Sequence, residues 1–381
     1  MLDVAVVGGG PVGLLCAVAL RLQGRAVTLL ERRAAPRSDS RSIGIHAASL
    51  ARMRGLGVLT SLLERGIQIE RGVALGSRGR LGTIEFRAAS TRFGFALAVP
   101  QAQTEALLEA RAHASGVELV RGANVNALEH RGDHVVLGYD HQGQRRSVSA
   151  RYLLGCDGAH SSIRRLLKVG VRRQALRGNF WMAEFPAKPE LGTDAWIYLA
   201  DQGLVESFPL PGDRRRWVVE VEARRDQVNL RELCRAVQFR CGQLLEPDAG
   251  SQPSAFGVTQ LLAQKFRCGR VLLLGDAAHV LSPFGGQGMN LGWLDALALA
   301  EVFAGHWTVG GLADAAVTDW EQRRRKAAKI ALRQAAWNTR IGRRTACPRL
   351  RNALVRVALL PPFAAHWSRR FAMVSLGGGT L

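Results

Sequence analysis

The sequence predicts an α/β fold: a Rossmann-like domain built from separated segments, an inserted antiparallel sheet, and a C-terminal helical tail. Three observations predict it. Residues 3–32 have the pattern of a buried strand, a glycine-rich turn, an apolar helix and a second strand. Apolar runs typical of buried parallel strands recur at residues 117–120, 151–154 and 271–274. Between the last two, residues 170–225 show the alternation and the Pro/Gly turns of antiparallel strands.

The first segment carries the pattern G-x-G-x-x-G at Gly8, Gly10 and Gly13. In such a turn the first glycine permits the bend, the second lets the backbone approach a pyrophosphate, and the third lets the helix pack closely on the strand. Glu31 ends the second strand, where a carboxylate can accept hydrogen bonds from ribose hydroxyls. A signal peptide or membrane helix is the weaker interpretation, because residues 4–20 have no basic flank and include five Gly or Pro residues. We therefore expect dinucleotide binding.

After residue 32 the chain alternates between helix-like and strand-like patterns. Helical spacing of apolar residues predicts one helix over residues 47–66 and another over 102–114. Short strand-like pieces separated by glycines fill residues 67–99. Alternating residues at 125–130 and 134–139 predict a hairpin.

The second half of the chain first continues as sheet and then becomes helical. Residues 230–246 look helical, a long helix is expected to begin near Asn290, and everything from residue 312 onward is helical or irregular. Six aromatic residues alternate on the predicted sheet, and we expect some of them to line a substrate pocket and the rest to pack in the core. They are Trp181, Phe185, Trp196, Tyr198, Phe208 and Trp217.

Because parallel and antiparallel stretches are interleaved, the domains must be discontinuous in sequence. We predict a nucleotide-binding domain, a sheet domain inserted in two pieces, and a helical tail, with ligands in the crevice at the carboxyl ends of the parallel strands. The predicted ranges are 1–70, 96–168 and 266–305 for the first, 71–95 and 169–265 for the second, and 306–381 for the third.

Charge and cysteine content limit the partners and the compartment. The formal net charge is +21, and residues 305–381 alone hold fourteen Arg or Lys residues against three acidic ones. We interpret this excess as a solvated basic face and expect no nucleic-acid partner, but a peripheral membrane contact through the basic C-terminal helices stays open. The six cysteines form no metal-ligand spacing with the nine histidines. We expect reduced thiols, no metal site and a cytoplasmic location.

Two further glycine-containing stretches each follow an apolar strand. The first holds Asp157 and Gly158, and the second begins with Gly275 and Asp276 and continues through residues 283–290. Asp276 can accept hydrogen bonds from sugar or ribityl hydroxyls. The glycines of 283–290 let the backbone lie against a flat ring, and the helix start that follows favours negative charge on that ring.

Together the three stretches resemble the FAD-dependent aromatic hydroxylases, the single-component flavoprotein monooxygenases that are p-hydroxybenzoate hydroxylase-like. Asp157-Gly158 and Gly275-Asp276 resemble the D-G and G-D motifs of that family. The pattern Gln101-x-x-x-Glu105-x-x-Leu108 and the turn that follows Phe208 are also similar to the family, over about residues 3–305. The resemblance implies a set of cofactor contacts. They are Gly8, Gly10, Val12, Gly13, Glu31, Arg32, Arg41, Gln101, Val125, Asp157, Asp276, Pro283, Gly286, Gly288, Met289 and Asn290.

The resemblance also implies the chemistry. In this family NADH or NADPH reduces the flavin, O2 adds at flavin C4a, and the hydroperoxide hydroxylates or epoxidises a hydrophobic, aromatic or polyketide-like substrate. No catalytic acid or base follows from the motifs. For His46 we expect a structural or solvent-exposed role, and for His279 packing or hydrogen bonding at the motif. Three alternatives remain: a reductase or dehydrogenase of the same fold, a halogenase, and a basic membrane- or nucleic-acid-binding protein with a vestigial flavin fold. A halogenase would need a positioned Lys and a W-x-W-x-I-P motif, and the sequence shows neither.

Overall fold

The computed structural model describes residues 1–37, 42–89, 92–222, 228–361 and 363–376. One of its two large sheets is mainly parallel and has the strand order β17-β18-β11-β1-β2-β8. All neighbours along this order are parallel except β17 and β18. The strands are β1 (Leu2–Val7), β2 (Val27–Glu31), β8 (Glu118–Arg121), β11 (Gln144–Gly155), β17 (Arg267–Cys268) and β18 (Val271–Leu273). A hairpin, β9 (Asn124–Arg131) and β10 (His134–His141), joins the first half of β11.

Helices pack on this sheet and on one another. The apolar helix α1 (Pro11–Arg21) contacts α4 (Gln101–Ala114) and α7 (Gln287–His306), and α7 contacts α8 (Asp314–Gly342). The single helix expected over 47–66 is wrong: the chain forms α2 (Ala47–Arg52), a 3-10 turn and α3 (Leu59–Arg65). Gly57 interrupts it in the left-handed conformation, with φ of 75°. The helix expected over 230–246 is shorter, because α6 (Leu230–Cys241) ends at Gly242, where φ is 72°.

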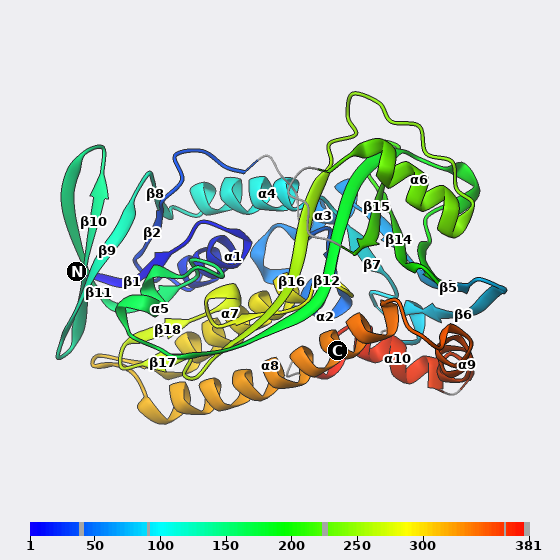
Figure 1. The fold of residues 1–381 in the computed structure, drawn as a ribbon. Coiled ribbons are helices and arrows are strands. Elements are labelled where there is room, and N and C mark those ends of the chain that lie inside the picture. The colour runs from blue at the N-terminus through cyan, green and yellow to red at the C-terminus, as the bar shows by residue number, and fades with distance from the viewer. Residues whose placement is uncertain (38–41, 90–91, 223–227, 362, 377–381) are drawn as a thin grey trace.

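The second large sheet has the order β19-β16-β12-β15-β14-β13-β5-β6 and is antiparallel except between β13 and β5. Its strands come from two distant parts of the chain: β5 (Arg71–Gly76) and β6 (Gly79–Glu85), and then β12 (Val171–Pro186), β13 (Ala195–Ala200), β14 (Gly203–Leu210), β15 (Arg214–Val221), β16 (Ser254–Ala263) and β19 (His279–Val280). The long strands β12 and β16 run side by side between the two halves of the molecule (Figure 1). A separate three-stranded sheet has the order β3 (Gly44–Ile45), β7 (Ala96–Ala98) and β4 (Ile67–Ile69). This arrangement confirms the predicted fold class, whereas the predicted domain boundaries stay a prediction.

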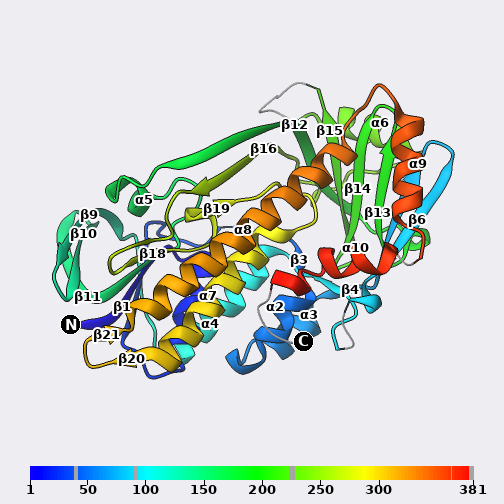
Figure 2. The ribbon, with the colours of Figure 1, turned by 90° about the horizontal axis from the view of Figure 1, so that it is seen from below.

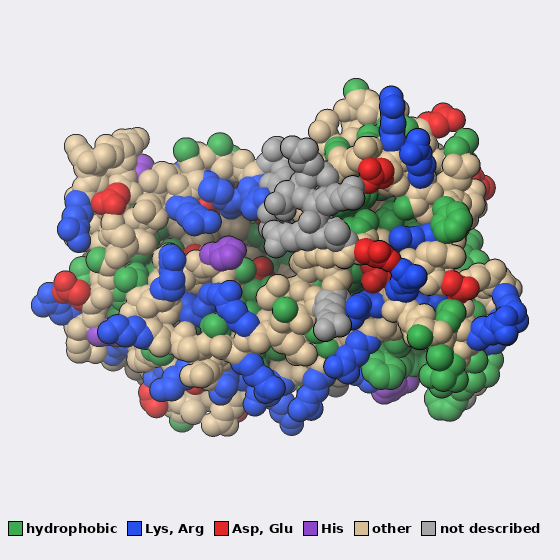
Figure 3. Space-filling view, viewed as in Figure 1, with side chains coloured by type: hydrophobic (Ala, Val, Ile, Leu, Met, Phe, Trp, Pro, Cys, Tyr) green, Lys and Arg blue, Asp and Glu red, His purple; other side chains and the backbone are tan. Residues whose placement is uncertain are grey.

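The C-terminal helices close the molecule along one side. Figure 2 shows α8 running the length of the molecule, with α9 (Pro348–Ala358) and α10 (Phe363–Phe371) beside β6. Arg351 of α9 donates to the carbonyl oxygen of Leu199 at 2.6 Å, and Ser368 of α10 donates to that of Glu85 at 2.6 Å. Lys and Arg side chains are spread along the edge where α8 lies (Figure 3). Within the described ranges, no helix is long and apolar enough to cross a membrane.

Candidate functional site

A cavity of about 1660 Å³ lies where the carboxyl ends of the parallel strands meet the second large sheet. Thirteen of the predicted contact residues line it: Gly8, Gly10, Val12, Glu31, Arg32, Gln101, Val125, Asp157, Asp276, Pro283, Gly286, Gly288 and Met289. Gly13 and Asn290 are buried behind its wall. Arg41 lies outside the described residues. The structure therefore brings the three glycine-containing stretches together around one space.

The three glycines of the first turn differ in what a side chain would meet at each position. Gly8 has φ of 110°, and a Cβ there would lie 2.3 Å from the carbonyl oxygen of Cys156. A Cβ on Gly13 would lie 1.9 Å from the carbonyl oxygen of Gly8, so this glycine lets α1 approach the turn. A Cβ on Gly10 would meet no protein atom within 4 Å. Because Gly10 faces the open cavity, the space in front of it fits a group that the protein itself does not supply.

The start of α1 suits an anion. Gly10 is its N-cap and provides no side-chain cap, so the N–H groups of the first turn and the positive end of the helix dipole are free of a capping side chain. A pyrophosphate at this position would accept from these groups.

Glu31 is held as a carboxylate at the end of β2. Its Oε2 accepts from the backbone N–H of Gly9 at 2.6 Å, and its Oε1 accepts from Arg33 N and Arg33 Nε, both at 2.9 Å. Burial opposes ionisation, but the hydrogen bonds from Arg33 and Gly9 outweigh it and hold the pKa of Glu31 below its ordinary value. The ion pair with Arg33 was not anticipated from the sequence. A charged acceptor therefore lies at the edge of the cavity, beside the glycine turn.

The D-G stretch is tied to the G-D stretch by a buried arginine. Asp157 Oδ2 accepts from Ser162 Oγ at 3.0 Å and from Ile163 N at 3.1 Å. Arg164 donates to the carbonyl oxygens of Ala277, at 2.7 Å, and Ala159, at 2.8 Å. Among the described residues, Asp157 Oδ1 is buried and has no partner. This orphaned oxygen beside the cavity fits a ligand that can donate to it.

The third stretch packs directly on the first. A Cβ on Gly292 would lie 2.6 Å from Val12 Cγ2, and Trp293 Nε1 donates to the carbonyl oxygen of Pro11 at 2.9 Å. The starts of α1 and α7 therefore interlock, which the two motifs considered separately did not indicate.

Asn290 acts as a clamp at the start of α7 instead of lining the cavity. Its Oδ1 accepts from His46 N at 2.9 Å, and its Nδ2 donates to the carbonyl oxygens of Gly44, at 2.9 Å, and Gly286, at 2.8 Å. These bonds join the loop that begins α7 to the chain around β3. Loop and strand are therefore held in direct contact beside the cavity.

The two histidines form hydrogen bonds inside the protein. His46 Nε2 is 2.7 Å from the carbonyl oxygen of Gly285, which can only accept, so Nε2 carries the proton. Burial lowers the pKa of His46 to about 4, although the bond to Gly285 opposes this shift. His279 lies outside the cavity wall, with Nε2 2.5 Å from Asp295 Oδ2, and Arg324 Nε donates to Asp295 Oδ1 at 2.6 Å. This buried cluster connects β19, α7 and α8.

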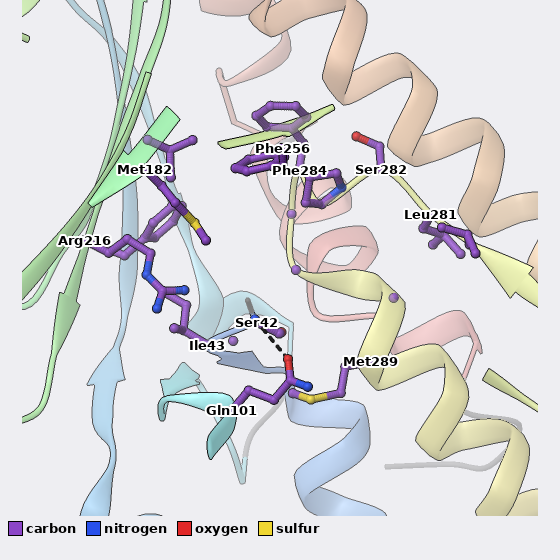
Figure 4. Close-up of a pocket in the computed structure, with 18 of the residues that line it drawn as sticks. Ser42, Ile43, Gln101, Met182, Arg216, Phe256, Leu281, Ser282, Phe284 and Met289 are labelled. Carbon is purple, nitrogen blue, oxygen red and sulfur yellow. Dashed lines mark hydrogen bonds between the residues drawn. The ribbon is translucent and has the colours of Figure 1, made fainter. Parts of the chain in front are cut away.

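The cavity extends between the second large sheet and the loop before α7. In Figure 4, Met182 and Arg216 extend from the sheet into this space, and Phe284 and Met289 lie across from them. Phe284 packs against Phe180, with ring centroids 4.6 Å apart. In the lower part of Figure 4, a dashed line marks the hydrogen bond that the backbone N–H of Ser42 donates to Gln101 Oε1 at 3.2 Å.

Most of the six predicted aromatic residues lie on the face of the second large sheet that is turned away from the cavity. Of the six, Phe208 alone lines the cavity. Four are buried in a core cluster that α6 covers through Leu233 and Val237, and Trp196 packs against that cluster. The four buried members are Trp181, Phe185, Tyr198 and Trp217. Because successive side chains in a strand point to opposite faces, most of these aromatic residues point toward α6 and not into the cavity.

Two ionisable groups on the cavity face of the sheet, Arg216 and Glu206, were not predicted. Arg216 Nη2 donates to Glu184 Oε1 at 2.5 Å. Glu206 of β14 is 9% exposed, and burial raises its pKa to about 8. The signal was present in the sequence, because Glu206 alternates with Leu204 and Phe208, which also face the cavity.

The C-terminal helices form the far wall of the cavity. Its lining side chains from α8, α9 and α10 include Trp337, Ile341, Leu354, Trp367 and Phe371, and Leu359, which follows α9, also lines it. The sequence predicted a helical tail, but its part in the cavity follows only from the structure.

Comparisons with known proteins match nearly the whole chain. A protein-family model described as an FAD binding domain matches residues 1–335. The rifampicin monooxygenase of Streptomyces venezuelae is 35% identical over 324 residues, which cover 82% of this chain and 67% of that protein. A 12-dehydrotetracycline 5-monooxygenase/anhydrotetracycline 6-monooxygenase of Streptomyces rimosus is 34% identical over 375 residues, covering 87% of this chain and 68% of that protein. The chain thus spans about two thirds of the length of these curated relatives.

A solved structure has the same fold. The Diels–Alderase PyrE3, from the biosynthetic pathway of pyrroindomycins, has a TM-score of 0.81 and 27% sequence identity to this chain. The alignment covers 98% of this chain and 80% of that one.

Proposed function

The chain belongs to the FAD-dependent aromatic hydroxylases, monooxygenases that take electrons from NAD(P)H, and on this premise we propose that its substrate is a multi-ring aromatic or polyketide-like molecule. This membership confirms the resemblance found in the sequence. One observation carries the proposal: a single cavity joins the three glycine-containing stretches to an apolar sheet face. The named relatives are monooxygenases of rifampicin and of 12-dehydrotetracycline and anhydrotetracycline, which supports a large substrate.

The cofactor would lie extended along the parallel-sheet side of the cavity. We assign its pyrophosphate to the start of α1, in the open space before Gly10, and its adenosine ribose to Glu31. Asp157 Oδ1 and Asp276 face the middle of the cavity and suit the ribityl hydroxyls. The loop 283–288, which Asn290 and His46 hold against the chain around β3, would lie beside the isoalloxazine.

The residues of this chain then position reactants and exclude water. FAD supplies the activation of O2 when it is bound. Met182 on the sheet faces Phe284 of the loop, and Phe256 also lines this space, so apolar side chains keep water away from the reacting groups. The C-terminal helices close the same space from the far side. No acid or base that transfers a proton in the reaction is assigned.

The test uses purified protein and measures oxygen incorporation. We expect FAD to copurify or to be restored by reconstitution. We expect polycyclic phenols to stimulate NAD(P)H oxidation and O2 consumption, with a product heavier by one oxygen atom. A substrate turned over without O2 consumption would indicate a reductase or an isomerising enzyme, and would contradict the proposal. Colourless protein that cannot be reconstituted with FAD would contradict it as well.

The sequence also raised the location of the protein and a membrane contact of its C-terminal helices. A cytoplasmic location is part of the proposal and is supported by the six unpaired cysteines, all within the described residues. A peripheral membrane contact through α9 and α10 has no support from the relatives. The packing of both helices against β6 explains part of their apolar content without a membrane.

A further inference from the structure

Within the cavity, the face of the second sheet is apolar around one carboxyl group. Four cavity-lining side chains form a row across neighbouring strands: Ile197 of β13, Glu206 of β14, Val218 of β15 and Met182 of β12. Directly opposed residues in antiparallel strands point to the same face. Along β14 itself, Leu204 and Phe208 flank Glu206 on that face. Glu206 is therefore an ionisable group within an apolar wall.

The neighbouring carboxyl groups on this sheet have partners, and Glu206 does not. Glu184 accepts from Arg216, and Glu220 accepts from the backbone N–H of Leu204 at 3.1 Å. Arg216 is turned toward Glu184 on β12, on the side of β15 away from β14. Within the part of the chain that the structure describes, the Glu206 carboxyl group has no hydrogen-bond or ion-pair partner.

A carboxyl group that faces a cavity and has no partner in the protein can take its partner from a ligand. We propose that Glu206 is a specificity-determining residue that selects substrates presenting a hydroxyl group to β14. This rests on the proposed function, because it assumes that the substrate binds at the sheet end of the cavity. A hydroxyl both donates and accepts, so it can pair with a carboxyl group in either protonation state. An apolar analogue would leave the carboxyl group unpaired and would bind more weakly.

The experiment compares two probes of nearly equal shape, 2-naphthol and the apolar 2-methylnaphthalene. Their binding to the FAD-loaded protein is measured by equilibrium dialysis, which needs no turnover. We expect the wild-type protein to bind 2-naphthol about tenfold more tightly, as one hydrogen bond to a buried group allows. Glu206→Leu should remove this preference to within about twofold, by weakening the binding of 2-naphthol and not that of 2-methylnaphthalene.

Two variants separate recognition from structural damage. Glu206→Gln keeps a donor and an acceptor, so it should retain part of the preference. Glu85→Leu makes the same chemical change at an exposed position of β6 in the same sheet, outside the cavity lining, and should leave the preference unchanged.

The outcomes distinguish this inference from the proposed function. Equal binding or no binding of the two probes by the wild-type protein, or a preference that survives Glu206→Leu, would overturn the role of Glu206. Oxygen incorporation would be unaffected by either result. A preference that disappears in Glu206→Leu alone would support the role even if the wild-type protein incorporates no oxygen.

Discussion

At the residue scale, Gly8 and Gly10 show one residue type meeting two different demands. Gly8 is required by the protein itself, because its φ of 110° and the nearby carbonyl oxygen of Cys156 leave no room for a side chain. Gly10 meets no such obstacle, and its surroundings are open. A glycine that the protein does not require, placed at an uncapped helix start, indicates a ligand that must approach the backbone.

A matched pair of substitutions tests this distinction. Gly8→Ala should destabilise the fold by about 3 kcal/mol, because it combines backbone strain with a clash. Gly10→Ala should change the free energy of unfolding of the FAD-free protein by less than about 1 kcal/mol and weaken FAD binding about tenfold or more. Urea unfolding and flavin fluorescence titration measure the two effects. Normal FAD affinity in Gly10→Ala would contradict the assignment of the pyrophosphate to this turn.

At the scale of elements, α9 is a wall of the cavity that is anchored by a single buried arginine. The Arg351 guanidinium donates to the carbonyl oxygens of Leu199, at 2.6 Å, Ala200, at 3.2 Å, and Arg343, at 3.2 Å. These bonds hold α9 to the end of β13, whereas Leu354, on the same helix, is largely exposed and still lines the cavity. The position of α9 therefore depends on the hydrogen bonds of Arg351 as well as on apolar packing such as that of Val355.

Replacing Arg351 should loosen the wall of the cavity that α9 forms and leave the parallel-sheet side, to which we assign FAD, intact. Arg351→Met should destabilise the protein by about 2–3 kcal/mol and accelerate hydrogen exchange in α9, because several buried carbonyl groups lose their donor. FAD affinity should stay within about twofold, since the cofactor contacts lie across the cavity. Arg356→Met, at an exposed position of the same helix, serves as the control. Equal exchange in both variants would show that Arg351 does not anchor α9.

At the scale of the whole molecule, two buried ionisable groups couple stability to pH in opposite directions. The pKa of His46 is lowered from 6.5 to about 4, so the native state binds fewer protons than the unfolded state between these values, and stability rises with pH there. The pKa of Glu206 is raised from 4.5 to about 8, so the native state binds more protons, and stability falls with pH between these values. Above pH 6.5 the contribution of Glu206 is no longer opposed by His46.

The expected result is a loss of stability between pH 6.5 and pH 8 that depends on Glu206. Glu206→Gln should reduce this loss, because the amide does not ionise, and should therefore raise the Tm more at pH 8 than at pH 5. Thermal unfolding of the FAD-free protein at several pH values measures the effect. An equal change in Tm at both pH values would show that Glu206 does not titrate in this range.

The sequence by itself determined the strand, glycine turn and helix start of the parallel-sheet side, to which we assign FAD. Short-range spacing carries that information, because a strand, a glycine turn and a helix start form within a few residues, as around Gly10 and Asp276. The tertiary structure decided the other side of the cavity, which the second large sheet and the C-terminal helices form. Whether Trp217 faces a helix and Glu206 the cavity depends on which face of the sheet α6 covers, and alternation alone does not show this. The wall formed by α9 likewise depends on pairings such as Arg351 with Leu199, between residues far apart in the sequence. Such contacts arise only when the whole chain packs.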